Sequence, residues 1–432
     1  CRARHTGTTR PGATSTSAAR RRRDRPAARP RATMRDAVPR RRRHAPRARL
    51  AGLHDATRRA RAHRGLVSRH ARGAGSAVTL AWVAVVLAAA LAASGGITEL
   101  VRRRAVRRAE YDVPNERSSH AVPTPRGGGV GVVVAVTAGG TALACGGHIE
   151  WRAWLAVALP GLLVALVGWL DDRGRMRVAR TRLALHVVAA IGLVAALGGL
   201  PPLTLLDAPV DLGWAGHALA VVYVVWMLNL FNFMDGIDGI TAVETMAVCA
   251  CVVGVEVLAG AGNELLAPPA LVAAACAGFL VYNWPPARIF LGDVGSGYVG
   301  YLIAALSLVS AGRDARGGWV WLVAVGVFAA DATVTLVRRV ARRERATVAH
   351  RTHAYQHLAP DATRHLPVSL GVGALTVAWL GPWGWAIASG AVPPLVGASL
   401  AYAPLVVGAW ALGAGRARAH ARAPLADDDQ RS

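Results

Sequence analysis

Two asparagines and two aspartates close a long apolar run in the stretch NLFNFMDGIDGI, residues 229–240. They are Asn229, Asn232, Asp235 and Asp238. The first three are spaced three residues apart and can share one face of a helix end, while glycines loosen the backbone around the last aspartate. The alternating ligands and distal glutamate of a calcium loop are absent. A turn that only ends a helix needs one polar residue of this kind rather than four. The stretch therefore predicts contact with a metal ion or a nucleotide. The alternative is that the aspartates bind only backbone groups.

Two adjacent carboxylates, Asp171 and Asp172, end another apolar run and precede five arginines within ten residues. Neighbouring side chains point to different faces of a helix, so both can serve one site only at a helix end or in a loop. The chemistry is that of a metal ligand or a general base beside a phosphate-binding arginine cluster. A solvated helix end is the alternative.

A glycine-rich stretch, FLGDVGSG, places Phe290 and Asp293 among three glycines. Glycines let backbone N–H groups approach phosphate oxygens, and a carboxylate can hold Mg²⁺. The stretch is not a P-loop, because the Gly-Lys-Ser/Thr ending is absent.

A histidine-rich stretch, HRTHAYQHL, supplies donors for anions. Its polar side chains are His350, Arg351, His353, Tyr355, Gln356 and His357. The three histidines can line one helical face, as zinc ligands do, but the glutamate of the HExxH pattern is missing. Binding of a phosphate or a sugar is the favoured interpretation, and a basic segment beside the membrane that attracts anionic lipid is the alternative.

These polar stretches lie between apolar runs in a chain of 432 residues that is 53% hydrophobic and 17% charged. Eleven runs are apolar enough to be candidate membrane spans, and such runs form helices because lipid offers the backbone no hydrogen bonds. The expected fold is all-α, a polytopic membrane bundle of about ten or eleven helices. Their approximate positions are 77–101, 129–147, 153–170, 183–200, 215–231, 241–260, 268–283, 297–312, 317–338, 367–389 and 392–413.

The net charge of +25 is concentrated near the N-terminus, where residues 1–72 hold 23 arginines and three acids. An Arg-rich segment can bind nucleic acid, yet this one has no aromatic residue for stacking bases. We therefore expect residues 1–76 to be disordered or a mistranslated upstream stretch, residues 77–414 to form the membrane domain and residues 415–432 to be a cytoplasmic tail. No nucleic-acid partner is predicted.

Arginines also predict the orientation, because loops on the cytoplasmic side carry the excess of positive charge. Seven lie between residues 102 and 126, five between 173 and 182, and seven between 338 and 364, whereas the alternate loops hold two or fewer. All the polar stretches above, together with DVPNERSSHAVPTPRGGG at 112–129, therefore fall on one cytoplasmic face. A transporter or lipid flippase is the alternative, but it would place paired charges inside the spans.

Together, these stretches resemble a known family over roughly residues 78–360. The ordered set PTPRGGG, DDR, NFMDGIDG, FLGDVGSG and HRTHAYQ is similar to that of the polyprenyl-phosphate N-acetylhexosamine-1-phosphate transferases, which include the translocase that makes the first lipid intermediate of peptidoglycan. The resemblance implies an enzyme of the bacterial plasma membrane that transfers an N-acetylhexosamine-1-phosphate from a UDP-sugar to a polyprenyl phosphate and releases UMP. Mg²⁺, or Mn²⁺ in its place, is the implied cofactor. The resemblance also allows a homodimer.

The same resemblance implies a role for each residue. Asp293 would be a metal ligand, with Asp172 at the same site, and Asp171 would deprotonate the lipid phosphate. Phe290 would stack on uracil, and Arg126 and Arg351 would bind substrate. Asn229 and Asn232 would also bind substrate. The predicted catalytic residues besides Asp171 and Asp172 are Asp235, Asp238, His350 and His353.

Two departures from the peptidoglycan translocase indicate another branch of the family. That enzyme carries three consecutive histidines where this chain has His350-Arg-Thr-His353, and the first polar loop looks more like the branch that starts O-antigen or other surface glycans, often on 6-deoxy sugars. We therefore expect a surface-glycan enzyme, with peptidoglycan lipid I synthesis as the alternative. Direct attack by the lipid phosphate and a covalent phospho-aspartate both remain open as mechanisms.

Overall fold

The computed structural model describes residues 79–114, 122–176, 178–344 and 351–416, all within one unit that spans Ala71–Ser432. The whole of the predicted Arg-rich segment 1–76, most of the tail 415–432 and His350 lie outside the described residues. The remaining predicted site residues all lie within them.

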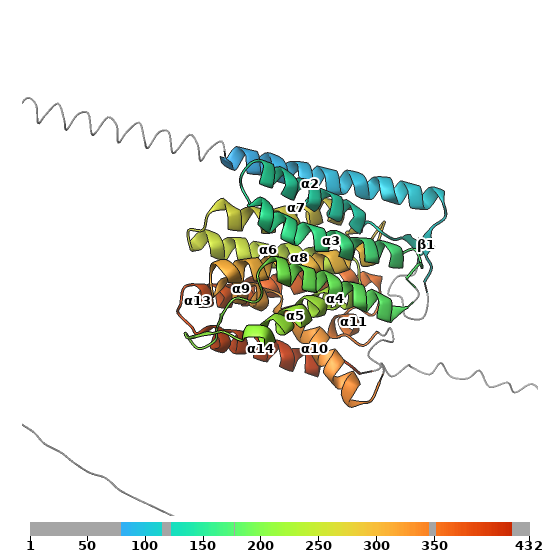
Figure 1. Ribbon diagram of the computed structural model, residues 1–432. Helices are drawn as coiled ribbons and strands as arrows, with labels where there is room; N and C mark the ends of the chain where they lie inside the picture. The colour runs from blue at the N-terminus through green and yellow to red at the C-terminus, as the bar shows by residue number, and fades with distance from the viewer. Residues whose placement is uncertain (1–78, 115–121, 177, 345–350, 417–432) are drawn as a thin grey trace, which may run out of the picture. The chain divides into compact units, whose positions relative to one another are not determined.

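The described residues are mainly helical, with two short antiparallel strand pairs (Figure 1). The helices are Thr79–Arg107, α2 (Gly129–Cys145), α3 (Trp151–Asp171), α4 (Ala179–Ala196), α5 (Gly213–Met234), α6 (Ile240–Leu258), α7 (Asn263–Asn283), α8 (Asp293–Arg313), α9 (Gly317–Ala324), α10 (Gly326–Ala341), α11 (Ala354–Leu358), α12 (His365–Leu375), α13 (Gly381–Ala388) and α14 (Pro394–Ala411). A 3₁₀ turn, η1 (Ala362–Arg364), precedes α12, and a π-helical segment, η2 (Thr376–Leu380), joins it to α13. The strands β1 (Tyr111–Asp112) and β2 (Thr124–Pro125) form one pair, and β3 (Leu203–Thr204) and β4 (Pro209–Val210) form the other.

Every predicted apolar run corresponds to a helix in this part of the chain. Among the described residues, nine helices are long and apolar enough to cross a membrane, and α9 and α10 together make a tenth span that bends by 64°. The run predicted at 129–147 is α2, which has 17 residues and is shorter than the others. The predicted all-α, polytopic fold is confirmed.

α8 is the central helix of the bundle. Its side chains are buried along nearly its whole length, because small residues in its first turns let α3 and α5 pack closely against it. By contrast, helices at the periphery expose large apolar side chains such as Leu159, Val222 and Val407, which are each more than 60% exposed. An exterior this apolar is suited to lipid rather than to water.

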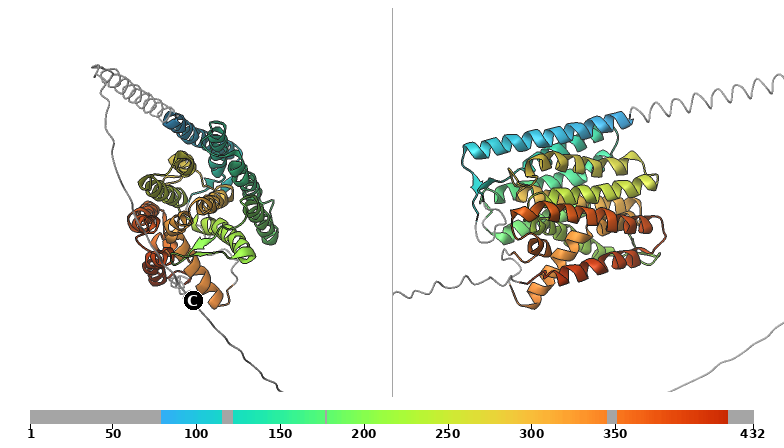
Figure 2. Two further views of the ribbon diagram at one scale, coloured as in Figure 1. Left: turned by 60° about the vertical axis from the view of Figure 1, so that its left-hand side comes forward. Right: turned by 180° about the vertical axis from the view of Figure 1, so that it is seen from behind.

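The helices run side by side between two ends, and β1 marks one of them (Figures 1 and 2). Hydrogen bonds and ion pairs join the predicted polar stretches to one another at the β1 end. The β3–β4 pair belongs to the opposite end, where the amide of Leu395 donates to the carbonyl of Leu205. The prediction that the polar stretches share one face of the bundle is thereby confirmed.

Candidate active site

The centre of the site is the N-terminus of α8, which begins at Asp293. The backbone N–H groups of Asp293 and Val294 donate to the two carboxylate oxygens of Asp172, over 2.9 and 3.1 Å. A helix N-terminus has unsatisfied N–H groups and a partial positive charge, so a carboxylate is a favourable cap there. Asp172 therefore ties the end of α3 to the start of α8 and lies next to the side chain of Asp293.

Two glycines make this close approach possible. Gly292 has φ of +78°, a conformation that side chains disfavour, and a Cβ there would lie 2.6 Å from an oxygen of Asp172. Gly168, in the last turn of α3, faces the backbone of Asp293, where a Cβ would lie 2.4 Å from the carbonyl oxygen. Any larger residue at either position would push the two carboxylates apart.

Asp293 is held from two sides, by Asn232, which the sequence predicts to be functional, and by Arg182, one of the five arginines that follow Asp172. The Asn232 amide, in the last turn of α5, donates to Asp293 Oδ1 over 2.9 Å and to Ser296 over 3.2 Å. Arg182 of α4 forms an ion pair with Asp171 and also lies 3.5 Å from Asp293 Oδ2. One guanidinium therefore bridges the two acidic stretches.

Asp235 completes a group of four carboxylates, Asp171, Asp172, Asp235 and Asp293, which we call the carboxylate cluster. Burial raises the pKa of Asp235 to about 7, the hydroxyl of Thr241 opposes this by donating to its carboxylate over 2.7 Å, and the charge of Asp293 adds to the rise. Burial and the same neighbouring charge raise the pKa of Asp172 to about 6. The cluster holds more negative charge than its surroundings neutralise, so a cation or a cationic group would be stabilised there.

The PTPRGGG loop closes over the FLGDVGSG stretch through main-chain bonds. The amides of Gly127 and Gly128 donate to the carbonyl of Phe290, and the amide of Phe290 donates to that of Pro125. The guanidinium of Arg126 donates to Asp112 over 2.7 Å. Burial acts to lower the pKa of Arg126, but the carboxylates of Asp112, Asp293, Asp172 and Asp235 raise it above its usual value. Main-chain bonds therefore hold Arg126, and Phe290 with its half-buried side chain, beside the segment that carries Asp293.

Asp238 is turned away from the cluster and is bound to the protein itself. Its carboxylate accepts from the amide of Ala287 over 3.1 Å and lies 3.2 Å from Nδ1 of His365, while its carbonyl accepts from Ser369. The contacts join the NFMDGIDG turn to the loop before α8 and to α12. The sequence analysis missed His365, because a lone histidine beyond the HRTHAYQHL stretch gave no signal.

His353 is also buried, 2% exposed, with Nδ1 3.3 Å from Asp331 Oδ1. Asp331 belongs to α10 and caps α11 by accepting from the amides of Ala354 and Tyr355. The hydroxyl of Tyr355 in turn donates to the carbonyl of Phe233 over 3.1 Å. Asp331 thus fixes the histidine-rich stretch against the end of α5. In the sequence, Asp331 stood out only as a single acidic residue inside an apolar run.

The other predicted residues have different surroundings. The amide of Asn229 donates to the carbonyl of Val225 in its own helix, over 2.7 Å. Arg351 is half-buried and close enough to Tyr355 for its charge to act on that phenol. The structure thus brings Asn232, Asp172 and Asp293 into direct contact, links Asp171 to Asp293 through Arg182, and gives Asn229 and Asp238 partners elsewhere.

Mg²⁺ fits the donor set as an ion shared with a ligand. In the described part of the chain, no three His, Cys, Asp or Glu side chains are grouped as a ready-made metal site. Mg²⁺ usually binds one or two carboxylates together with substrate phosphates and water. Asp293 and Asp172 supply two such carboxylates. Each carboxylate oxygen of Asp172 accepts one backbone N–H and still has a lone pair for a metal ion.

Comparisons with known proteins identify the family of this chain. Residues 154–311 match the family model described as glycosyl transferase family 4. The chain is 29% identical over 275 residues to a probable undecaprenyl-phosphate N-acetylglucosaminyl 1-phosphate transferase of Bacillus subtilis, covering 62% of this chain and 75% of the relative. It is 30% identical over 300 residues to the decaprenyl-phosphate N-acetylglucosaminephosphotransferase of Mycobacterium leprae, covering 62% and 73%. A phospho-N-acetylmuramoyl-pentapeptide-transferase of Synechococcus is 36% identical over 192 residues, covering 40% and 52%.

Proposed function

Because this chain belongs to glycosyl transferase family 4, we propose that it transfers an N-acetylhexosamine-1-phosphate from a UDP-sugar to a polyprenyl phosphate and releases UMP. The observation that carries the proposal is the meeting of Asp172 and Asp293 at the N-terminus of α8. Such an arrangement supplies carboxylates for a hard cation and backbone amides for anions, within a lipid-embedded bundle.

In the proposed reaction, an oxygen of the lipid phosphate attacks the β-phosphorus of the UDP-sugar. The new bond joins this oxygen to phosphorus, the bond from the same phosphorus to the bridging oxygen breaks, and UMP leaves with that electron pair. Asp171 would accept a proton from the lipid phosphate, while Arg182, which bridges Asp171 and Asp293, would orient both carboxylates. Phe290 and Arg126 would hold the nucleotide and the phosphates beside them.

Mg²⁺, with Mn²⁺ as a substitute, is part of the proposal. Asp293 and Asp172 would hold it, and its chemistry when bound is to offset the charge of the diphosphate. Asn232 would fix the orientation of the Asp293 carboxylate through the 2.9 Å bond. Burial raises the pKa of Asp235 to about 7 and the charge of Asp293 adds to the rise, so a cation bound nearby would be favourable.

The names of the relatives suggest which sugar the UDP donor carries and to which branch of the family this chain is closer. Two of the relatives named above carry N-acetylglucosamine in their names, whereas the third is named for phospho-N-acetylmuramoyl-pentapeptide and is matched over only 52% of its length. We place this chain with the first group, as an initiator of a surface glycan such as O-antigen or a cell-wall polymer. The site would lie on the cytoplasmic face of the plasma membrane.

Membranes that contain the protein, incubated with Mg²⁺, undecaprenyl phosphate and a panel of radiolabelled UDP-N-acetylhexosamines, test the proposal. We expect one donor to give labelled lipid together with an equal amount of UMP. Asp293→Ala should lower this rate by about 100-fold to 1,000-fold, as expected when a preorganised charge is removed from the reacting group. The matched control is Asp314→Asn, which changes a carboxylate at the opposite end of α8 and should leave the rate unchanged. Absence of labelled lipid with every donor would refute the enzyme and favour the transporter.

A further inference from the structure

The turn between α5 and α6, which carries Asp235, lies directly against the short helix α11. A Cβ on Gly236, the residue after Asp235, would lie 2.2 Å from the hydroxyl oxygen of Tyr355 and 3.1 Å from the side-chain nitrogen of Gln356. A glycine is therefore required here for space rather than for its backbone conformation. The proposed reaction gives Tyr355 no role, although this tyrosine touches the neighbour of a member of the carboxylate cluster.

The hydroxyl of Tyr355 binds the backbone on both sides of Asp235. It donates to the carbonyl of Phe233 over 3.1 Å and accepts from the N–H of Gly236. The last carbonyls of a helix have no partner within that helix, and α5 ends at Met234, so the first of these bonds also caps α5. One hydroxyl thus fixes the backbone before and after the carboxylate.

Tyr355 is itself held in place by its surroundings. It is 3% exposed, and burial raises the pKa of its phenol well above the usual range, with the charges of Asp331 and Asp235 adding to the rise. The phenol therefore stays neutral, which is the form that can donate one hydrogen bond and accept another. Asp331 of α10 accepts from the amide of Tyr355 over 3.0 Å and from the hydroxyl of Thr335 over 3.1 Å. Tyr355 therefore ties the turn to α10.

The turn needs such support because its carboxylate faces other carboxylates. Asp235 accepts from the hydroxyl of Thr241 over 2.7 Å and is close enough to Asp172 and Asp293 for their charges to act on it. Carboxylates held this close repel one another when ionised, so the turn would move away from the cluster unless other contacts opposed the movement. Without the hydroxyl of Tyr355, a bound cation would lose part of the negative charge that stabilises it.

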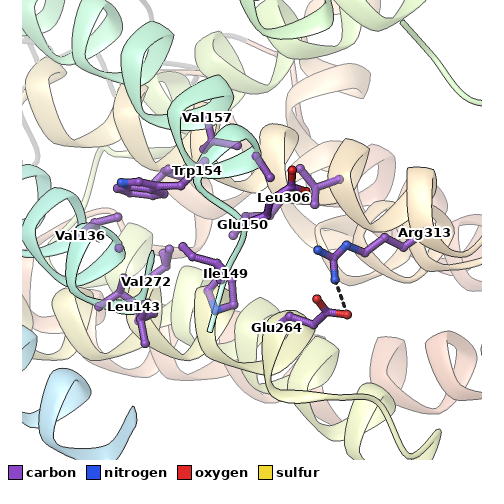
Figure 3. Close-up of a pocket in the computed structure, with 16 residues that line it drawn as sticks. Val136, Leu143, Ile149, Glu150, Trp154, Val157, Glu264, Val272, Leu306 and Arg313 are labelled. Atoms are coloured by element: carbon purple, nitrogen blue, oxygen red, sulfur yellow. Dashed lines mark ion pairs between the residues drawn. The ribbon is translucent and has the colours of Figure 1, made fainter. Parts of the chain in front are cut away.

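Two other polar contacts that the proposed reaction leaves unused join membrane-spanning helices to one another. At the opposite end of α8, Arg313 pairs with Glu264 of α7 over 2.8 Å beside a narrow pocket (Figure 3). Inside the bundle, Glu244 of α6 accepts from the hydroxyl of Thr376 over 2.8 Å. The hydroxyl in α11 differs from both, because it is bound to a turn that carries a member of the cluster.

We propose that Tyr355 is a positioning residue, whose hydroxyl holds Asp235 beside Asp172 and Asp293 so that the cluster binds a divalent cation tightly. This inference rests on the proposed function, in which Asp172 and Asp293 would hold Mg²⁺. Tyr355 acts through Asp235 and touches neither the cation nor the reacting atoms.

Binding of Mn²⁺ to the purified protein, followed by electron paramagnetic resonance without lipid acceptor, tests this role in the absence of turnover. Tyr355→Phe should weaken binding by about threefold to tenfold, the effect expected for loss of one neutral hydrogen bond. In a protein that carries Asp235→Asn, the same substitution should have no further effect, because the carboxylate through which it acts is gone.

Gly236→Ala provides a second variant that leaves the hydroxyl in place but pushes it away from the turn. It should also weaken the binding of Mn²⁺. Combined with Tyr355→Phe, it should cost less than the sum of the two single effects, because removal of the hydroxyl makes room for the new methyl group.

Tyr402→Phe is the matched control, since the hydroxyl of Tyr402 in α14 donates to the carbonyl of Leu322 in α9 over 2.6 Å. It removes the same kind of bond and should keep the affinity for Mn²⁺. An equal loss in this control, no loss in Tyr355→Phe, an undiminished effect beside Asp235→Asn, or a wild-type protein that binds no Mn²⁺ would each overturn the inference. A protein whose Mn²⁺ affinity depends on Tyr355 but which makes no labelled lipid would leave the inference standing and refute the proposed reaction.

Discussion

Asp172 and Asp235 are carboxylates in surroundings that disfavour their charge. Burial is the main cause, and the nearby charge of Asp293 adds to it, so the pKa values rise to about 6 and about 7. In the unfolded chain both groups would titrate near 3.8. Since a raised pKa means that the folded protein binds protons more tightly than the unfolded chain, the stability contributed by these groups is lost as the pH rises through the folded values.

Without divalent cations, therefore, thermal stability should fall between pH 5 and about pH 7. Unfolding temperatures measured in detergent with a chelator would show this slope, and Asp235→Asn should reduce it because the titrating group is gone. Asp314→Asn, far from the cluster, should keep the slope. A profile that is flat in the wild type, or equally steep in Asp235→Asn, would contradict the assignment of these protons.

Gly168 offers a test of how closely α3 must approach α8. In Gly168→Ala the new methyl group would lie 2.4 Å from the carbonyl oxygen of Asp293, and backbone atoms there cannot move without moving the carboxylate. We expect turnover to fall by about 100-fold, the effect of a displacement of about 1 Å in a reacting group. Gly254→Ala, in α6 with open space around it, is the matched control and should be active. Normal turnover in Gly168→Ala would show that the contact is not needed.

At the scale of elements, the last helix is fastened to the histidine-rich stretch. The buried guanidinium of Arg338, in α10, donates to the carbonyls of Trp410 and Ala414 at the end of α14 and lies over the ring of Trp410. The amide of Gly415 then donates to the carbonyl of Thr352. The end of α14 thus supports the backbone that leads into His353, although no residue of α14 contributes to the predicted site.

Arg338→Met should therefore lower both stability and turnover. Two carbonyl groups lose their charged donor, which corresponds to about 2 kcal/mol in the free energy of unfolding. Thermal unfolding and the rate of UMP release would be measured together. Arg343→Gln, an exposed arginine in the turn after α10, is the control and should behave like the wild type. If Arg338→Met unfolded at the wild-type temperature, the contact with α14 would have no supporting role.

At the scale of the whole molecule, exposed tryptophans lie at both ends of the helical bundle. Trp82, Trp151 and Trp214 stand at the starts of helices at the β3–β4 end, while Trp284 and Trp410 lie at the end that carries the cluster. Tryptophan prefers the two interfaces of a bilayer, so these residues mark the depth at which the protein would sit. The distribution of arginine then predicts that the cluster end faces the cytoplasm.

Cysteine labelling in intact cells tests this orientation. In a variant without Cys145, Gly262→Cys at the β3–β4 end should react with a membrane-impermeant maleimide, and Arg175→Cys at the cluster end should react only after the membrane is opened. Both positions are exposed. The reverse pattern would invert the proposed topology.

Apolar runs in the sequence predicted where the long helices lie, because spans depend on local hydrophobicity. The count of arginines predicted that the polar stretches meet at one end of the bundle. Contacts between distant segments were not predictable in this way. The carboxylate of Asp172 is bound by backbone amides of α8, and backbone groups leave no mark in a sequence. Similarly, Asp238 and His353 looked like reacting groups, but their partners His365 and Asp331 lie elsewhere in the chain.

The cap that Asp172 provides to α8 also has a consequence for biogenesis. The two partners are 121 residues apart, and four complete helices, α4 to α7, are synthesised between them. While the ribosome makes that stretch, the carboxylate of Asp172 has no helix end to receive it, and the N–H groups that it will accept do not yet exist. A nascent chain therefore cannot complete the proposed site before its central helix, α8, has been synthesised.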